Sequence, residues 1–175
     1  MNWFLNMKIG IKLLISYILI ALIAGAMGIF SIYNIKTLAQ SDTSLYEHMT
    51  VPLAEMAHIS TEFQRSRVNV RDMIIAQEPQ EIQDYIDRIA ERRATVSEVS
   101  ASFEEKILSD EMKNKYAEFL EARKAYGAAL DKVIELGRQN RDAEALAMIA
   151  ENGELGVASR AEQDIIDEIV SMKTE

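Results

Sequence analysis

Three arginines occupy positions at which the surrounding sequence places apolar residues. Arg67, Arg93 and Arg123 each lie in a row of mostly apolar residues spaced alternately four and three apart, which is the spacing of the buried seam between packed helices. A buried guanidinium without a partner loses several kcal/mol of hydration. The same group can bind a carboxylate through two parallel hydrogen bonds. The three residues therefore predict a site for a small acidic molecule.

The three arginines are expected at a similar height in a folded helical bundle. Arg67 precedes a predicted turn at Glu78, Arg93 follows that turn, and Arg123 precedes a predicted turn at Gly137. At ~1.5 Å of rise per residue, their levels fall within ~10 Å of one another. The alternative is that these side chains reach solvent at the rim or pair with acidic residues. Candidate acidic partners are Asp72, Glu91, Glu118 and Glu121.

A second group of arginines, Arg65, Arg67 and Arg71, lies on one predicted helix. Arg67 and Arg71 stand one helical turn apart, whereas Arg65 points about 200° away from Arg67. If two copies of the chain pack through these helices, Arg65 or Arg71 could reach across the interface and share a ligand. The alternative is a solvated helix face.

Several other kinds of chemistry are excluded by composition. The chain has no cysteine, and its formal net charge of −9 is wrong for a nucleic-acid binder. Glu55 and His58 have the Glu-x-x-His spacing of dinuclear metal sites, but no histidine follows His58 to complete one. There is no glycine-rich phosphate loop and no nucleophile elbow. We therefore expect no enzyme, no metal and no cofactor.

The elements that must position the arginines are four long helices. Pro79 favours the first turn of a helix, Ser109 is a helix cap before two acidic residues, and Gly137 ends a third segment. These signals delimit segments 36–77, 79–107, 110–137 and 142–175. Helices of about 30 residues joined by short loops must fold back on one another, so we expect an all-α, antiparallel, up-down-up-down four-helix bundle.

The first three segments show a regular heptad spacing of apolar residues, typical of helices that cross at small angles. The predicted seams are Met49, Leu53, Met56, Ser60, Phe63, Arg67, Val70 and Ile74; Ile82, Ile86, Ile89, Arg93, Val96, Ser100, Phe103 and Ile107; and Met112, Tyr116, Phe119, Arg123, Tyr126, Leu130, Val133 and Gly137. In the fourth segment we assign only Leu146, Ile149, Ile165, Ile169 and Met172, and we expect a kink or break near Gly153. Pro52 is expected to bend the first helix because it lacks an amide hydrogen.

The N-terminal part of the chain is expected to cross a membrane. Residues 13–35 form a run of 23 residues without charge, long enough to span a bilayer as a helix. Lys8 and Lys12 precede the run, so the positive-inside rule places residues 1–12 in the cytoplasm and residues 36–175 outside it. The aromatic residues that can sit near the two membrane interfaces are Trp3, Phe4, Tyr17 and Tyr33. A cleaved signal peptide ending at Ala24-Gly25-Ala26 is the alternative, but the apolar run is too long for one.

With these features in view, the chain resembles the N-terminal sensor portion of bacterial methyl-accepting chemotaxis proteins, of the four-helix-bundle type. The similar stretches are Trp3-Phe4 with Lys8-Ile9-Gly10-Ile11-Lys12-Leu13-Leu14, Leu45-Tyr46-Glu47 with Val51-Pro52-Leu53, and Phe63-Gln64-Arg65-Ser66-Arg67-Val68-Asn69-Val70-Arg71-Asp72. The resemblance implies a periplasmic homodimeric bundle anchored in the bacterial inner membrane. It also implies that arginines of the first helix, here Arg65, Arg67 and Arg71, bind small amino or organic acids.

The function expected from this resemblance is sensing a small, acidic ligand and transmitting helix motion across the membrane for chemotaxis. A second transmembrane helix, a linker and a cytoplasmic signalling part that contacts kinase-coupling partners are expected beyond Glu175. Two alternatives stay open. The same module can precede a histidine kinase or a cyclic-dinucleotide enzyme, or the bundle can recognise a partner protein without any small ligand.

Overall fold

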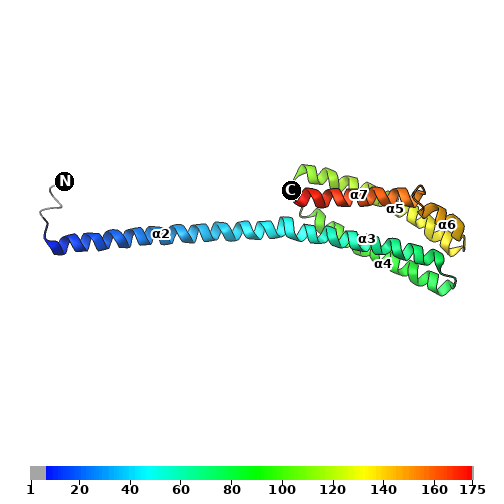
Figure 1. The fold of residues 1–175 in the computed structure, drawn as a ribbon, viewed down its shortest axis with the longest axis horizontal. Coiled ribbons are helices and arrows are strands. Elements are labelled where there is room, and N and C mark those ends of the chain that lie inside the picture. The colour runs from blue at the N-terminus through cyan, green and yellow to red at the C-terminus, as the bar shows by residue number, and fades with distance from the viewer. Residues whose placement is uncertain (1–6, 175) are drawn as a thin grey trace. The chain divides into compact units, whose positions relative to one another are not determined.

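The computed structural model describes residues 7–174, and within that range the chain is helical with no strand (Figure 1). Its helices are α2 (Ile9–Leu45), a π-helical turn η1 (Tyr46–Thr50), α3 (Val51–Ile75), α4 (Pro79–Glu104), α5 (Asp110–Arg138), α6 (Asp142–Ile149) and α7 (Glu154–Thr174). The predicted all-α fold is confirmed. Trp3 and Phe4 lie outside the described residues.

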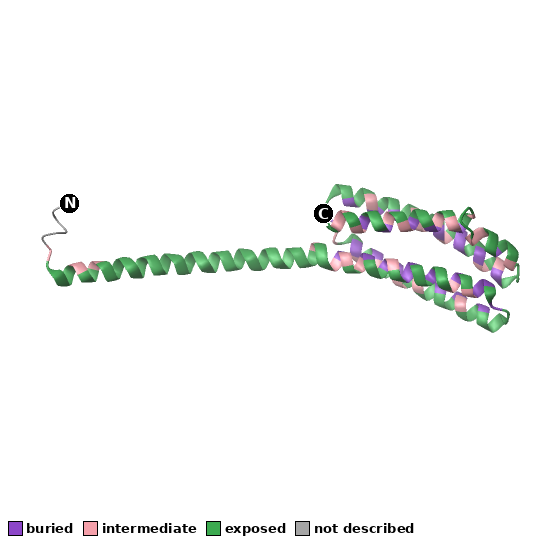
Figure 2. Cartoon of the chain, in the orientation of Figure 1, coloured by how far each residue is buried: buried purple, intermediate pink, exposed green. Residues whose placement is uncertain are grey.

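Helix α2 is apolar and has no buried residue. Figure 2 shows it exposed along its length apart from a short half-buried stretch near its N-terminal end. Large apolar side chains such as Ile29 and Phe30 are about two-thirds exposed or more. The helix is long and apolar enough to cross a membrane, which confirms the predicted apolar N-terminal helix. Residues 1–45 and residues 46–175 form two separate compact units, and the second unit is the bundle.

Contacts between neighbouring helices show the antiparallel order α3, α4, α5, α7. Along each pair, the residue numbers of one helix rise as those of its partner fall. The pairs are Glu55–Ser102 and Glu62–Arg92 between α3 and α4, Arg93–Asp131 and Tyr116–Ser100 between α4 and α5, Lys115–Glu168 and Lys132–Glu154 between α5 and α7, and Gln64–Gln163 and Lys173–His48 between α7 and the α3 side. The bundle therefore has the predicted up-down-up-down topology.

The predicted seams of α4 and α5 form the centre of the core. Every apolar residue assigned to these two seams is buried, with Ile89, Phe103, Phe119, Leu130 and Val133 fully so. In α3 the seam is buried from Met56 to Ile74 except at Ser60, which is half-buried, and Arg67, which is exposed. The start of the predicted seam was wrong, because Met49 in the π-helical turn is exposed and Leu53 is half-buried. The buried faces turn toward one another inside the bundle (Figure 2).

The buried seam of the last helix differs from the one assigned from the sequence. Its buried residues are Leu155, Ser159, Glu162, Ile166 and Ile169, which continue the four-three spacing of the other helices. Leu146, assigned to the seam, is exposed on α6, and Ile165 is only half-buried. The assignment was wrong because two of the true seam positions carry polar residues, Ser159 and Glu162.

The helix ends follow the predicted signals. Pro79 is the first residue of α4, and the Ser109 hydroxyl accepts a 3.1 Å hydrogen bond from the amide of Met112 in the first turn of α5. The expected break near Gly153 is confirmed, because α6 ends at Ile149 and α7 begins at Glu154. The chain doubles back so tightly here that a Cβ at Gly153 would lie 2.2 Å from the Ala147 carbonyl oxygen.

Pro52 lies in the first turn of α3, directly after the π-helical turn. Because proline has no amide hydrogen, an α-helix leaves the carbonyl four residues earlier, that of His48, without its donor. Lys173 near the end of α7 supplies one, its Nζ donating to the His48 carbonyl oxygen at 3.0 Å. The start of the first bundle helix and the end of the last are thus joined.

Candidate functional site

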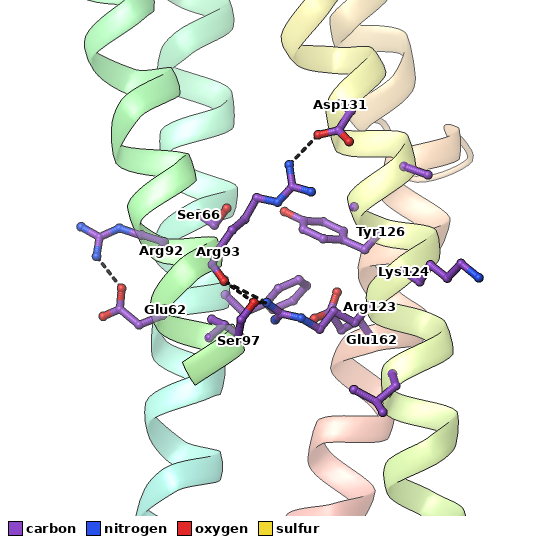
Figure 3. Close-up of a pocket in the computed structure, with 15 residues that line it drawn as sticks. Glu62, Ser66, Arg92, Arg93, Ser97, Arg123, Lys124, Tyr126, Asp131 and Glu162 are labelled. Atoms are coloured by element: carbon purple, nitrogen blue, oxygen red, sulfur yellow. Dashed lines mark hydrogen bonds and ion pairs between the residues drawn. The ribbon is translucent and has the colours of Figure 1, made fainter. Parts of the chain in front are cut away.

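A cavity of about 540 Å³ lies between the hairpin of α3 and α4 and the hairpin of α5 and α7 (Figure 3). Its lining combines apolar residues with a concentration of charged and hydroxyl groups. The polar residues lining it are Glu62, Ser66, Arg92, Arg93, Ser97, Arg123, Lys124, Tyr126, Asp131 and Glu162. A cavity of this size, with a few converging polar groups, is typical of small-molecule sites.

Arg123 extends from α5 across the cavity to α4 (Figure 3). Its Nη2 donates to the backbone carbonyl of Arg93 at 3.0 Å and to the Ser97 hydroxyl at 2.9 Å. Burial lowers the pKa of Arg123, the charge of Glu162 opposing that change. Neither of these two acceptors is charged, so the guanidinium keeps a positive charge that no ion pair within residues 7–174 neutralises.

Arg93 extends the opposite way, from α4 toward α5, where its Nη1 pairs with Asp131 Oδ1 at 2.5 Å. Its guanidinium lies against Gly127, where an added Cβ would sit 3.3 Å from Nη2. The Asp131 side chain is 61% exposed, and ion pairs with exposed carboxylates contribute little. A ligand carboxylate inside the cavity can therefore replace Asp131 at modest cost.

Glu162 of α7 contributes a carboxyl group to the same cavity. The residue is 0% exposed, and neither carboxyl oxygen has a hydrogen-bond partner within the described chain. Burial raises the pKa of Glu162 to about 7, although the nearby charge of Arg123 opposes the rise. Tyr126 and Ser66 are also buried beside the cavity, and burial raises the pKa of Tyr126 to about 12.

The rim on the α3–α4 side is closed by a separate ion-pair group. Glu62 is buried and is held by Arg92 and, at 2.8 Å, by Arg65. Burial favours the neutral form of Glu62, but the hydrogen bonds and charges of the two arginines outweigh it and lower the pKa of that carboxyl. Arg92 and Arg65 are thus occupied within the hairpin, which leaves Arg93 and Arg123 as the cations facing the interior.

Comparison with known families identifies this arrangement of helices. Residues 6–175 match the family described as a four-helix-bundle sensory module for signal transduction. The chain belongs to this family. The sensory module is that of chemotaxis receptors, which confirms the resemblance seen in the sequence. No curated protein matches the sequence.

The sensory module places the five predicted arginines in three different settings. Arg93 and Arg123 share the cavity between the hairpins. Arg67 and Arg71 line a smaller cavity of about 70 Å³ beside Ser159 of α7. Arg65 lies outside both cavities, paired with Glu62.

Arg67 does not occupy the buried position that its spacing predicted. It is exposed, its Nη1 donates to Gln64 Oε1 at 2.9 Å, and its guanidinium lies 5.9 Å from the centroid of the Phe63 ring. The long stem covers the apolar ring while the charged end stays in water. The neighbouring Ser66 is buried instead. Of the three arginines expected at a similar height, Arg93 and Arg123 line the cavity and Arg67 does not.

Glu162 lines the cavity of this sensory module but is not among the site residues predicted from the sequence. A signal was present, because counting back from Ile169 in steps of three and four reaches Ile166, Glu162, Ser159 and Leu155. That row places an acidic residue on the seam of the fourth helix. Within residues 7–174, no three histidine, aspartate or glutamate side chains gather as metal ligands do.

Proposed function

We propose that this chain is the extracytoplasmic sensor region of a bacterial chemoreceptor, and that a small carboxylate-bearing molecule binds in the cavity between its two hairpins. The observation that carries the proposal is the pair of guanidinium groups, Arg93 and Arg123, which cross that cavity from opposite sides. Neither is committed to a buried carboxylate. Two forks facing one space suit an anion that bridges them.

The proposed location follows from the charge distribution around α2. Lys8 and Lys12 precede its uncharged stretch, and the first acidic residue is Asp42. The positive-inside rule then places the N-terminus in the cytoplasm and the bundle in the periplasm. A homodimer held in the inner membrane, which the resemblance to methyl-accepting chemotaxis proteins implies, is part of this proposal.

The proposed mechanism is a change in how the two hairpins pack. A ligand bound to Arg93 on α4 and Arg123 on α5 connects one hairpin to the other. The ligand favours the packing in which the separation of the two guanidinium groups matches the length of the ligand. The free energy by which it shifts the balance between the two packings equals the difference in its binding free energy for them. Shifts of about 1–2 Å between packed helices are typical of such transitions. Helix α7, in the second hairpin, would carry the shift to the end of the bundle.

The test is calorimetric titration of the detergent-solubilised chain with acetate, malate and citrate. We expect at least one of them to bind and to raise the unfolding midpoint with concentration. Replacing Arg93 or Arg123 by methionine should weaken binding about 10- to 100-fold, because each removes charged hydrogen bonds to the ligand.

Arg88→Met is the matched control, because Arg88 is an exposed arginine of α4 that stacks on Tyr85 and does not line the cavity. It should leave the affinity unchanged. Failure of all three acids to bind, or equal weakening by the Arg88 variant, would contradict the proposed function.

A further inference from the structure

The cavity contains a buried acidic side chain, which is unexpected in a site that binds an anion. Glu162 is fully buried, has no hydrogen-bond partner within the described chain, and lies close to the Arg123 end of the cavity (Figure 3). A ligand carboxylate drawn in by Arg123 and Arg93 would come to rest near a second, buried negative charge. Two carboxylates that share a site cannot both stay ionised without a large penalty.

We infer that the site binds its carboxylate ligand together with one proton, which Glu162 takes up and donates to the ligand as a hydrogen bond. This inference rests on the proposed function, since it concerns the same cavity and the same ligand class. It assigns Glu162 the role of a specificity-determining residue. The site would then favour ligands with a free carboxylate oxygen beside Glu162, and it would favour them more strongly at lower pH.

The surroundings of Glu162 support proton uptake on binding. The charged and titratable groups that line the cavity with it are Glu62 of α3, Arg92 and Arg93 of α4, and Arg123, Lys124, Tyr126 and Asp131 of α5. Glu62 is already held ionised by Arg92 and Arg65, and Asp131 is exposed and pairs with Arg93. The pKa of Tyr126, about 12, keeps that hydroxyl neutral at ordinary pH. Glu162 is therefore the group free to change charge.

Arg123, whose positive charge favours the ionised form of Glu162, is also a residue that the ligand carboxylate would bind. The charge of Arg123 lowers the pKa of Glu162, against the larger effect of burial. A ligand carboxylate bound to Arg123 neutralises the charge of that residue. Burial then dominates the pKa of Glu162 and favours its protonated form. In its protonated form the carboxyl has an O–H donor, and the ligand oxygen beside it is an ionised acceptor. Hydrogen bonds of that kind are shorter and stronger than neutral ones.

A site that binds a zwitterion would differ from this one in the direction of proton exchange on binding. A ligand ammonium placed beside Glu162 would pair with the ionised carboxylate, and its binding would release a proton or leave the charge unchanged. The sign of the proton exchange thus tells which end of the ligand faces Glu162. It can be measured on the wild-type chain without any substitution.

The experiment is titration of the solubilised chain with malate and succinate at about pH 6.5 and about pH 8.5, in HEPES and in Tris buffers, which differ in ionisation enthalpy. We expect affinity to rise up to about tenfold per pH unit on lowering the pH above the pKa of Glu162. The heat should differ between the buffers in the direction of proton uptake, approaching one proton per ligand at the higher pH.

Glu162→Gln supplies the matched variant, because its amide can donate a hydrogen bond at every pH. It should bind the same acids with an affinity that does not depend on pH and that exceeds the wild-type affinity at about pH 8.5. Glu168→Gln on the same helix is the control, since Glu168 is exposed, pairs with Lys115 and does not line the cavity. It should keep the wild-type pH dependence. Circular dichroism of both variants verifies that the bundle is folded.

The outcomes separate this inference from the proposed function. Binding with no pH dependence and no proton uptake overturns the role of Glu162 and leaves the carboxylate site standing. Binding that weakens as pH falls, with proton release, overturns it in favour of a cationic ligand group beside Glu162. If neither acid binds at either pH, the carboxylate site and the inference fail together.

Discussion

The carboxyl group of Glu162 should make the stability of the bundle depend on pH. Its pKa in the folded chain is about 7, above its ordinary value, because burial disfavours the charged form. A group whose pKa is raised on folding favours the folded state when it is protonated. Its contribution is therefore fully present below its unfolded pKa and is lost as the pH rises through about 7.

Glu162→Gln removes this dependence and is expected to stabilise the chain at alkaline pH. From the shift in pKa, the gain relative to wild type is about 3 kcal/mol at pH 8 and close to zero at about pH 4. Denaturant unfolding at the two pH values measures it. A gain of the same size at both values would show that packing, and not ionisation, is responsible. Glu168→Gln, on the exposed side of α7, should show no such difference.

At the scale of single residues, the positions of Arg93 and Arg123 between the helices could be predicted from the sequence. The exposure of Arg67 to solvent could not. All three occupy seam positions by spacing, but spacing does not tell whether a long side chain stays in the seam or bends out to water. Arg67 leaves because the Phe63 ring offers its stem an apolar surface and Gln64 offers its guanidinium an acceptor at the edge. Both contacts depend on the packed geometry.

At the scale of elements, the helix boundaries and three of the four seams follow from spacing and caps. The heptad rows of α4 and α5 are buried where they were assigned, and Ser109 caps α5 as its position indicates. The buried seam of α7 was predicted wrongly because Ser159 and Glu162 interrupt its apolar pattern. Polar residues at buried positions are common at functional sites, so the place where the pattern failed is also where the candidate site lies.

The tight turn between α6 and α7 leaves no space for a side chain at Gly156. A Cβ at Gly156 would lie 1.9 Å from the backbone carbonyl oxygen of Ala150, and that oxygen cannot move without moving the turn. We expect Gly156→Ala to destabilise the chain by about 1–3 kcal/mol, the usual cost of overpacking. The midpoint of denaturant unfolding is the measurement.

Gly127→Ala on α5 is the matched control for Gly156→Ala. There the nearest atom to an added Cβ is the end of the Arg93 side chain, at 3.3 Å, which can swing aside. The substitution should therefore be neutral or stabilising by up to about 1 kcal/mol, because alanine favours helix more than glycine does. Equal changes in stability from the two substitutions would refute the turn argument, because the close approach at Gly156 would then cost nothing beyond the common change in helix propensity.

At the scale of the whole bundle, the contact between Lys173 and His48 joins the helix that begins the bundle to the helix that ends it. The Nζ of Lys173 donates to the His48 carbonyl at 3.0 Å and lies 5.8 Å from the centroid of the Phe103 ring. Burial lowers the pKa of Lys173, in keeping with a cation that has partly left water. Any shift of α7 would act on the π-helical turn through this contact.

Lys173→Met tests whether that contact holds the turn in place. Methionine keeps the apolar stem but leaves the His48 carbonyl without its side-chain donor, a loss of about 1 kcal/mol for a partly exposed charged hydrogen bond. Amide hydrogen exchange in residues 46–53 should therefore speed up by about five- to tenfold, while exchange around residues 150–156 at the other end of α7 stays the same. Lys132→Met, which breaks only an exposed pair with Glu154, is the control and should leave exchange in residues 46–53 unchanged. If Lys173→Met leaves exchange in residues 46–53 unchanged, the π-helical turn is held by α3 alone, and α7 would need another route to transmit a shift.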